Sequence, residues 1–369
     1  MAIENRKRRV CIMVPSHWSA SMGGAEYQVK LLIKVLTSRN DVRVWYLARS
    51  IDEQYSPDTY ELRKIGDSRG QRTAMDACGI LKALHEIRPD VIYARVGTAH
   101  VGIAAYYCRA NDCKLMWHVA SMQDLIPPRF RMRDLGFPIV DRCMLNYGIR
   151  KAERIITQTE EQAAIVRSKY QAQATTIRNF HPTPTEHVDK SMPVNVVWIG
   201  NFKFLKQPEV FVDVAAALEH TQAKFVMVGA NQLSSVRLRE LLDRIAKVRE
   251  LSYVGAMNQT CVNELLARSH ILVNTSITEG FSNTFIQAWM RQVPVASLNE
   301  DPDNLLTTKN LGVCTHGDVR QLTREVESMI KHPDKRSAMG MAAYRYSVSQ
   351  LGMENAEKLA TLIATGNDR

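Results

Sequence analysis

The sequence predicts an α/β protein made of two doubly wound domains, each with a mostly parallel sheet. Short apolar runs alternate with stretches of helical periodicity along the chain, which is the pattern of βαβ units. The alternation starts afresh after a polar linker that contains Pro182, Pro184 and Pro193. A length of 369 residues is long for one domain and ordinary for two.

The first half supplies the elements of one such sheet. Strands are expected at 10–14, 42–47, 91–94, 114–119, 155–159 and 175–179, and helices at 29–36, 73–87, 98–109, 160–170 and from Pro138 onward. The second half supplies another set. Its strands are expected at 196–199, 225–228, 251–255, 271–274 and 293–297, and its helices at 209–218, 236–248, 262–267, 285–289, 319–331, 335–347 and 354–364. Ligands of such sheets bind outside the carboxyl ends of the strands.

Charge and cysteine content narrow the class of protein. Residues 1–190 carry 29 Lys and Arg against 20 Asp and Glu, whereas the rest of the chain is close to neutral. This predicts an anionic partner for the first half, but no RNA-binding motif is present, so nucleic acid ranks last among the possible partners.

No apolar run reaches membrane-span length. The basic N-terminus does not resemble a signal peptide, and the seven scattered cysteines form no CxxC pair. We therefore expect a cytoplasmic protein with free thiols.

The stretch 276–294 carries the clearest functional pattern. Glu279 stands on a glycine turn between a strand and a helix, and Gln287 lies two helical turns further on. A carboxylate and an amide on one side of a ligand suit uncharged sugar hydroxyls, which donate and accept hydrogen bonds. Alternatively, Glu279 caps the helix and Gln287 is an ordinary surface residue.

Three further positions follow predicted strands. Gly23 and Gly24 open a helix after the first strand, where a ligand can approach the backbone closely, although no GxGxxG or GxxxxGK[ST] motif is present. His118 ends the strand at 114–119, either as a structural histidine or as part of a ligand site. Lys206 follows Gly200 and precedes a helix, where a cation suits a diphosphate, or is simply solvated.

Together these residues resemble the retaining glycosyltransferases of family 4. The resemblance rests on Glu279-Gly280-Phe281 with Gln287, on Gly23-Gly24-Ala25-Glu26, on Asn179, and on Gly200 with Lys206. It implies a GT-B fold, with two Rossmann-like parallel-sheet domains that face each other across a cleft and a C-terminal helix that crosses back to the first domain. The implied divisions are an acceptor-binding domain at 1–183, a donor-binding domain at 192–345 and the returning helix at 346–369.

The resemblance also implies residue roles. Catalytic roles fall to Lys206, Glu279 and His118, and donor binding falls to Gly23, Gly24, Gly200, Asn201, Lys206, Gly280, Phe281, Ser282 and Gln287. Asn201 stands where the family has Arg, and Gln287 where it has a second Glu. The donor is expected to be a UDP- or GDP-sugar, with no cofactor, no metal and no protein nucleophile. Asp301-Pro302-Asp303 is a formal DxD, which we interpret as a helix start.

The segment from residue 126 to 151 differs from its surroundings. Arg129, Arg131 and Arg133 alternate with apolar residues, and an amphipathic pattern follows. One interpretation is a solvated loop with a core-facing helix. The other is a docking surface for an anionic membrane, at its inner face, or for a lipid-linked acceptor. The expected acceptor is a lipid-linked or growing saccharide of the cell surface. Two alternatives stay open: a sugar-nucleotide epimerase of the same fold, and a two-lobed sugar-binding protein.

Overall fold

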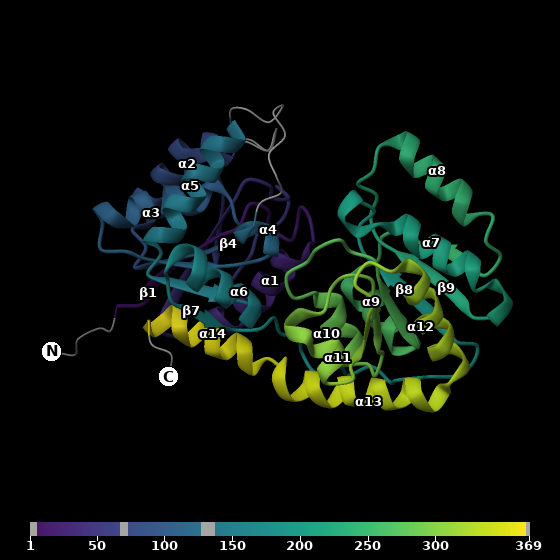
Figure 1. Cartoon of the computed structure of the whole chain (residues 1–369). Coiled ribbons are helices and arrows are strands. Elements are labelled where there is room, and N and C mark those ends of the chain that lie inside the picture. The colour runs from purple at the N-terminus through teal and green to yellow at the C-terminus, as the bar shows by residue number, and fades with distance from the viewer. Residues whose placement is uncertain (1–5, 67–72, 127–136, 367–369) are drawn as a thin grey trace. The chain divides into compact units, whose positions relative to one another are not determined.

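The computed structural model describes residues 6–66, 73–126 and 137–366 (Figure 1). The chain divides into two compact units. Unit 1 comprises Met1–Phe180 together with Met353–Arg369, and unit 2 comprises His181–Gly352. Each unit is an α/β domain with its own parallel sheet, so the predicted fold class is confirmed.

Unit 1 contains a seven-stranded sheet in the order β3-β2-β1-β4-β5-β6-β7. Its strands are β1 (Arg8–Met13), β2 (Val42–Ala48), β3 (Glu61–Lys64), β4 (Val91–Arg95), β5 (Lys114–His118), β6 (Arg154–Thr157) and β7 (Ala174–Thr176). Its helices are α1 (Gly24–Thr37), α2 (Ala77–Ile87), α3 (Ala99–Ala110), α4 (Met122–Leu125), α5 (Phe137–Lys151), α6 (Glu160–Ile165) and α14 (Glu354–Thr365). The strand order reverses between β1 and β4, which is where doubly wound sheets bind ligands.

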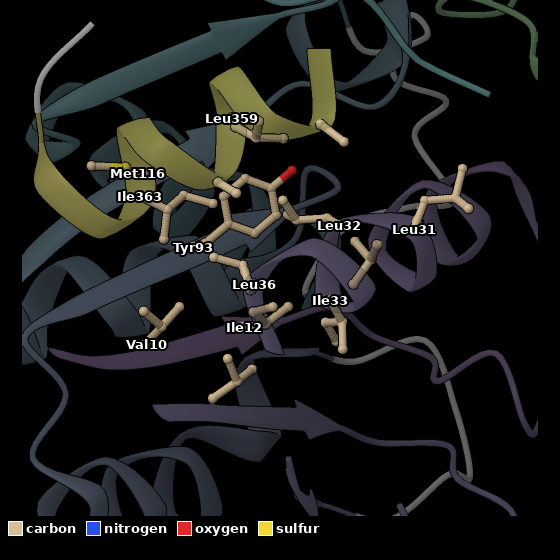
Figure 2. Close-up of a cluster of buried hydrophobic side chains, with 14 of the residues drawn as sticks. Val10, Ile12, Leu31, Leu32, Ile33, Leu36, Tyr93, Met116, Leu359 and Ile363 are labelled. Carbon is tan, nitrogen blue, oxygen red and sulfur yellow. The ribbon is translucent and has the colours of Figure 1, made fainter. Parts of the chain in front are cut away.

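Helices cover both faces of this sheet. Alternate residues of β1 point to opposite faces, so Val10 and Ile12 pack with α1 and α14, whereas Cys11 and Met13 pack with α2 and α3. Figure 2 shows the first cluster, in which Leu359 and Ile363 of α14 lie beside Leu32, Leu36 and Tyr93. The last helix of the chain therefore belongs to the core of the first unit, as predicted.

Unit 2 contains a six-stranded parallel sheet in the order β10-β9-β8-β11-β12-β13. Its strands are β8 (Asn195–Ile199), β9 (Lys224–Val228), β10 (Leu251–Tyr253), β11 (Ile271–Asn274), β12 (Val295–Ser297) and β13 (Gly312–Cys314). Its helices are α7 (Pro208–Ala217), α8 (Ser235–Ile245), α9 (Gln259–Ala267), α10 (Asn283–Trp289), α11 (Leu305–Thr308), α12 (Val319–Lys331) and α13 (Pro333–Gln350). Here the strand order reverses between β8 and β11.

The structure adds short elements that the sequence pattern did not predict. These are the edge strands β3 and β13 and the single-turn helix α4. The helix expected at 160–170 is instead α6 followed by a π-helical turn, Val166–Tyr170. All seven cysteines are unpaired, as predicted. Within the described part of the chain, no helix is long and apolar enough to cross a membrane.

Two glycines allow α3 and α5 to cross at close range. A Cβ placed on Gly102 would lie 2.2 Å from the carbonyl oxygen of Met144, and one placed on Gly148 would lie 2.6 Å from the carbonyl carbon of Val101. No side chain fits between backbones at these distances, so this crossing requires glycine on both helices.

Gly102→Ala should therefore destabilise unit 1 by roughly 1–3 kcal/mol, the usual cost of overpacking. In a solvent-exposed helix, Gly→Ala instead stabilises the protein by up to about 1 kcal/mol. The sign of the change in unfolding free energy therefore tests whether α3 and α5 approach each other closely. Gly79→Ala in α2 is the matched control, because its Cβ would meet nothing nearer than 3.4 Å. Urea unfolding of the two variants gives the comparison. A Gly102→Ala protein as stable as the wild type would mean that the helices lie further apart.

Candidate functional site

Two loops meet at the carboxyl edge of the sheet in unit 2. Strands β8 and β11 are neighbours in parallel register, so the segments that follow them lie side by side. The first segment contains the 3₁₀ turn Phe204–Lys206, and the second runs from Thr275 to Ser282. The Ile277 N–H donates to the Leu205 carbonyl at 2.9 Å, which joins them directly.

Thr275 completes this junction. Its hydroxyl lies 2.6 Å from the Lys206 carbonyl oxygen and 2.9 Å from that of Gln207, and it accepts a hydrogen bond from Trp198 Nε1 at 2.8 Å. Both Thr275 and Trp198 are buried. The backbone that carries Lys206 is therefore held against the end of β11.

Lys206 and Glu279 form an ion pair at this edge, in contact through Lys206 Nζ and Glu279 Oε1. Ser276 Oγ also donates to Oε1, at 2.8 Å, and Asn274 Nδ2 lies 3.5 Å from it. The two side chains are only 19% and 16% exposed. Among the described residues, the second oxygen, Oε2, makes no hydrogen bond to protein. It can therefore accept one from a ligand.

The electrostatic balance keeps Glu279 ionised. Burial acts to raise the pKa of its carboxyl group. The ammonium charge of Lys206 and the hydrogen bonds from Lys206, Ser276 and Asn274 together lower the pKa by more than burial raises it. The net result is a pKa below the usual value for Glu. At neutral pH the site presents a carboxylate and an ammonium group in contact.

Gly200 and Asn201 belong to the backbone of the first loop. Gly229, after β9, has φ +154°, and a Cβ there would lie 1.9 Å from the Gly200 carbonyl oxygen. Asn201 Oδ1 accepts a hydrogen bond from the Ala230 N–H at 3.3 Å. Asn201 thus ties together the turns that follow β8 and β9.

The segment from Gly280 to Gln287 leads into α10. Phe281 is buried with its ring edge-on to Trp289, and Ser282, the N-cap residue, bonds through its hydroxyl to Thr284 at 2.9 Å. Gln287 is 3% exposed, and its Nε2 donates to Asn263 Oδ1 at 3.4 Å. The alternative in which Glu279 caps this helix and Gln287 is a surface residue is therefore wrong.

The predicted residues of unit 1 lie at the carboxyl edge of its own sheet. Gly23 is the N-cap of α1, which begins at Gly24. His118 ends β5 and is fully buried, with Nδ1 2.7 Å from the Tyr93 hydroxyl. Asn179 is also buried and accepts a hydrogen bond from Arg95 at 2.7 Å. Arg129, Arg131 and Arg133 lie outside the described residues.

Asp301 begins a helix, as predicted. Its carboxylate accepts hydrogen bonds from the backbone N–H groups of Leu306 and Thr307, at 2.7 and 3.3 Å. Its oxygens are therefore occupied in organising the start of α11. In the described ranges, no group of three or more His, Cys, Asp or Glu side chains is arranged to hold a metal ion.

Some residues of the site were not predicted. Thr275 and Ser276 follow an apolar strand directly, and a cluster of polar residues at a strand end was the available signal. Arg95 ends an apolar strand in the same way, yet its guanidinium is buried. Another ion pair, between the buried Arg291 and the partly exposed Glu186 at 2.9 Å, lies elsewhere in unit 2.

Comparison with solved structures identifies the fold. The chain superposes with a TM-score of 0.79 on sucrose-phosphate synthase from Thermosynechococcus elongatus, at 13% identity, over 96% of this chain and 98% of that one. It superposes on WaaG, a glycosyltransferase of lipopolysaccharide biosynthesis, with a TM-score of 0.77 at 15% identity, over 97% and 100%. For HepE of Anabaena, solved with UDP and glucose, the TM-score is 0.74 at 16% identity, over 97% and 100%. The fold is therefore that of the GT-B glycosyltransferases.

Residues 193–332 match the family model of the glycosyl transferases group 1. The matched segment lies within unit 2 and agrees with the family that the sequence resembles. A comparison with curated protein sequences gave no significant match.

Thr275→Val should weaken the junction between the two loops of unit 2. It leaves the Trp198 N–H and a loop carbonyl without a partner, which costs roughly 1–3 kcal/mol for buried groups. Thr323→Val in α12 is the control, because the Thr323 hydroxyl donates to the Val319 carbonyl of its own helix and joins no two loops in the described part of the chain. Thermal unfolding should show a clearly lower Tm for Thr275→Val alone. Equal Tm values for the two variants would show that Thr275 does not stabilise the junction between the two loops.

Proposed function

We propose that unit 2 binds the nucleotide-sugar donor at the Lys206–Glu279 pair and that both residues take part in transfer. The observation that carries this proposal is the asymmetry of Glu279. One carboxylate oxygen is fixed by Lys206, Ser276 and Asn274, and the other is left open among the described residues. A carboxylate held in this way accepts a hydrogen bond from a sugar hydroxyl without having to reorganise.

Lys206 would stabilise the leaving diphosphate. Negative charge grows on the diphosphate as the bond to the sugar breaks, and a nearby ammonium group lowers the energy of that state. The glycine turn at Gly200 gives the phosphates access to the backbone, and Lys206 supplies the charge that Asn201 does not carry. No protein nucleophile is required if the departing diphosphate takes the acceptor proton. Gln287 would contact the ribose, through an amide that contacts Asn263 in this structure.

The donor is proposed to be a UDP- or GDP-sugar, with no divalent metal required. The structure of HepE, which has the same fold, was solved with UDP-glucose, and this supports UDP as the first nucleotide to test. Asp301 is engaged at the start of α11, which supports a mechanism in which Asp301 and Asp303 hold no ion.

The acceptor is proposed to be a saccharide, lipid-linked or growing, that is bound by unit 1 during synthesis of cell-surface glycans. WaaG acts in lipopolysaccharide biosynthesis and WaaB is a lipopolysaccharide core galactosyltransferase, and both share the fold. The positive excess of residues 1–190 suits an acceptor held at the anionic inner face of a membrane.

Lys206→Ala and Glu279→Ala should each lower turnover by about a hundredfold or more while the protein stays folded, because each removes a charge contact of the transition state. A thermal-shift screen against UDP-, GDP-, ADP- and dTDP-sugars, with and without EDTA, first identifies the donor. Rates are then compared with those of Lys309→Ala and Glu264→Ala, two exposed positions of unit 2. Near-normal rates for Lys206→Ala and Glu279→Ala would mean that the donor does not bind at these two residues. A loss of activity in EDTA would bring Asp301 and Asp303 back into consideration.

Membrane attachment should depend on Arg129, Arg131 and Arg133. Basic residues near an anionic bilayer contribute about 1 kcal/mol each, so sedimentation with liposomes should rise with anionic lipid content and fall with added salt. Changing the three residues to Glu should abolish binding, whereas the same change at Arg239, Arg320 and Arg324, which are exposed in unit 2, should not. Equal binding to neutral and anionic liposomes would show that the positive charge serves solubility alone.

A further inference from the structure

An aromatic cluster lies at the carboxyl ends of β1 and β2 in unit 1. It is built from the loop that follows β1 and from the segment between β2 and β3. The two segments are joined by a parallel bridge between Ser16 and Ser50 and by the backbone N–H of His17, which donates to the Ser50 carbonyl at 2.8 Å. The rings of the cluster are those of His17, Trp18, Tyr46, Tyr55 and Tyr60.

His17 stands at the centre of this cluster. Its ring is buried, and the ring centroid lies 3.9 Å from that of Trp18 and 5.0 Å from that of Tyr55. The backbone N–H of Ser19 donates to Nδ1 at 3.1 Å, so Nδ1 carries the lone pair and the ring hydrogen sits on Nε2. Nε2–H then donates to the Tyr60 hydroxyl at 2.8 Å. Both nitrogens of His17 are therefore satisfied by protein groups, and the imidazole is fixed in place.

The cluster is uncharged at its centre. Burial, and then the positive charge of Lys30, lower the pKa of His17 to about 4. Burial and a hydrogen bond with Tyr55 raise the pKa of Tyr60. The imidazole and the Tyr60 phenol are therefore both neutral at physiological pH. A neutral aromatic surface suits a ligand with apolar area, and it offers little to a phosphate or a carboxylate.

A turn holds Tyr55 beside Trp18. The Tyr55 N–H donates to the Asp52 carbonyl at 3.0 Å, and the Asp52 N–H donates to Ser19 Oγ at 3.1 Å. The segment after β2 is thereby fastened to the loop after β1. The ring centroids of Trp18 and Tyr55 lie 6.4 Å apart, and their planes meet at 76°. The two rings therefore form the two sides of a corner.

This corner is partly exposed. Tyr55 is 39% exposed, and Trp18 is only partly buried against the core of unit 1. Met22, in the same loop as Trp18, is 41% exposed. Trp and Tyr combine an apolar face with a polar edge. A sugar ring has the complementary surface, because its C–H groups form an apolar face and its hydroxyl groups lie around the rim.

We propose that Trp18 and Tyr55 form a saccharide-binding platform in unit 1, on which one neutral sugar ring of the acceptor stacks through its C–H face. The acceptor in this statement rests on the proposed function, whereas the binding of a neutral sugar ring does not. His17 and Tyr60 are positioning residues, which fix the two rings before the ligand arrives and so reduce the ordering that binding requires. Every residue of the platform belongs to unit 1.

Tryptophan fluorescence of the full-length protein tests the platform without a nucleotide sugar. All five tryptophans lie in the described part of the chain, and Trp18 alone is partly exposed, because Trp45, Trp117, Trp198 and Trp289 are buried. The protein is titrated with the methyl glycosides of glucose, galactose, mannose and N-acetylglucosamine. At least one of them should give a saturable change in emission, and inorganic phosphate should give none. No saturable change with any of the four would overturn the proposal.

Substitution of Tyr55 keeps the Trp18 reporter in place. Tyr55→Leu should weaken the binding of that glycoside about tenfold, because it removes one stacking ring, whereas Tyr55→Phe keeps the ring and should retain most of the affinity. Tyr106→Leu, at an exposed tyrosine of α3, is the matched control and should bind as the wild type does. If Tyr55→Leu lowers the Tm, Tyr55→Gln replaces it. Wild-type affinity in the variants that lack the ring would also overturn the proposal.

Transfer kinetics separate this proposal from the proposed function. With an identified donor and acceptor, Tyr55→Leu should raise the KM for the acceptor about tenfold and leave kcat and the binding of the nucleotide sugar unchanged. If glycosides bind at Trp18 but no sugar nucleotide is turned over, the proposed function fails and the platform stands. If transfer proceeds and Tyr55→Leu has the wild-type KM for the acceptor, the platform fails and the proposed function stands.

Discussion

Parallel pairing of the first strand on both of its sides is the constraint on which the rest of this molecule depends. In unit 1, β1 pairs with β2 and β4, and in unit 2, β8 pairs with β9 and β11. Each arrangement requires helical crossovers in opposite directions, so helices cover both faces of each sheet. A separate hydrophobic core therefore lies on each face. It also brings segments far apart in sequence to one edge. Lys206 reaches Glu279 because β8 lies beside β11.

The contact between Lys206 and Glu279 is stable because each side chain offsets the desolvation of the other. A lone charge at so little exposure would be costly, and removing one partner leaves the other uncompensated. A diphosphate can replace Glu279 as the partner of Lys206, since it too is an anion. The hydrogen bonds from Ser276 and Asn274 keep the carboxylate satisfied during such an exchange. The pair therefore has the property that the proposed donor site requires.

The alternation of strands and helices could be predicted from the sequence, and so could the placement of Lys206 and Glu279 on turns after strands. Periodicity and glycine turns are local signals, which is why they sufficed. It was not sufficient for β3 and β13, whose three or four residues gain their conformation from pairing at a sheet edge. Thr275 was missed for a related reason, since its partners Lys206 and Gln207 are nearly 70 residues away in the chain. Arg95 was missed because an arginine after an apolar run ordinarily marks the solvated end of a strand.

The carboxyl edges of the two sheets differ in their chemistry. A diphosphate carries charge, so a site for it needs a cation, and Lys206 supplies one beside an ionised Glu279. The carboxyl edge of the unit 1 sheet instead holds His118 neutral, because burial and the positive charge of Arg95 both lower its pKa. Arg95 NH1 lies 3.4 Å from Nδ1 of His118, where its charge disfavours a proton. A cation therefore acts in unit 1 by keeping its neighbour uncharged.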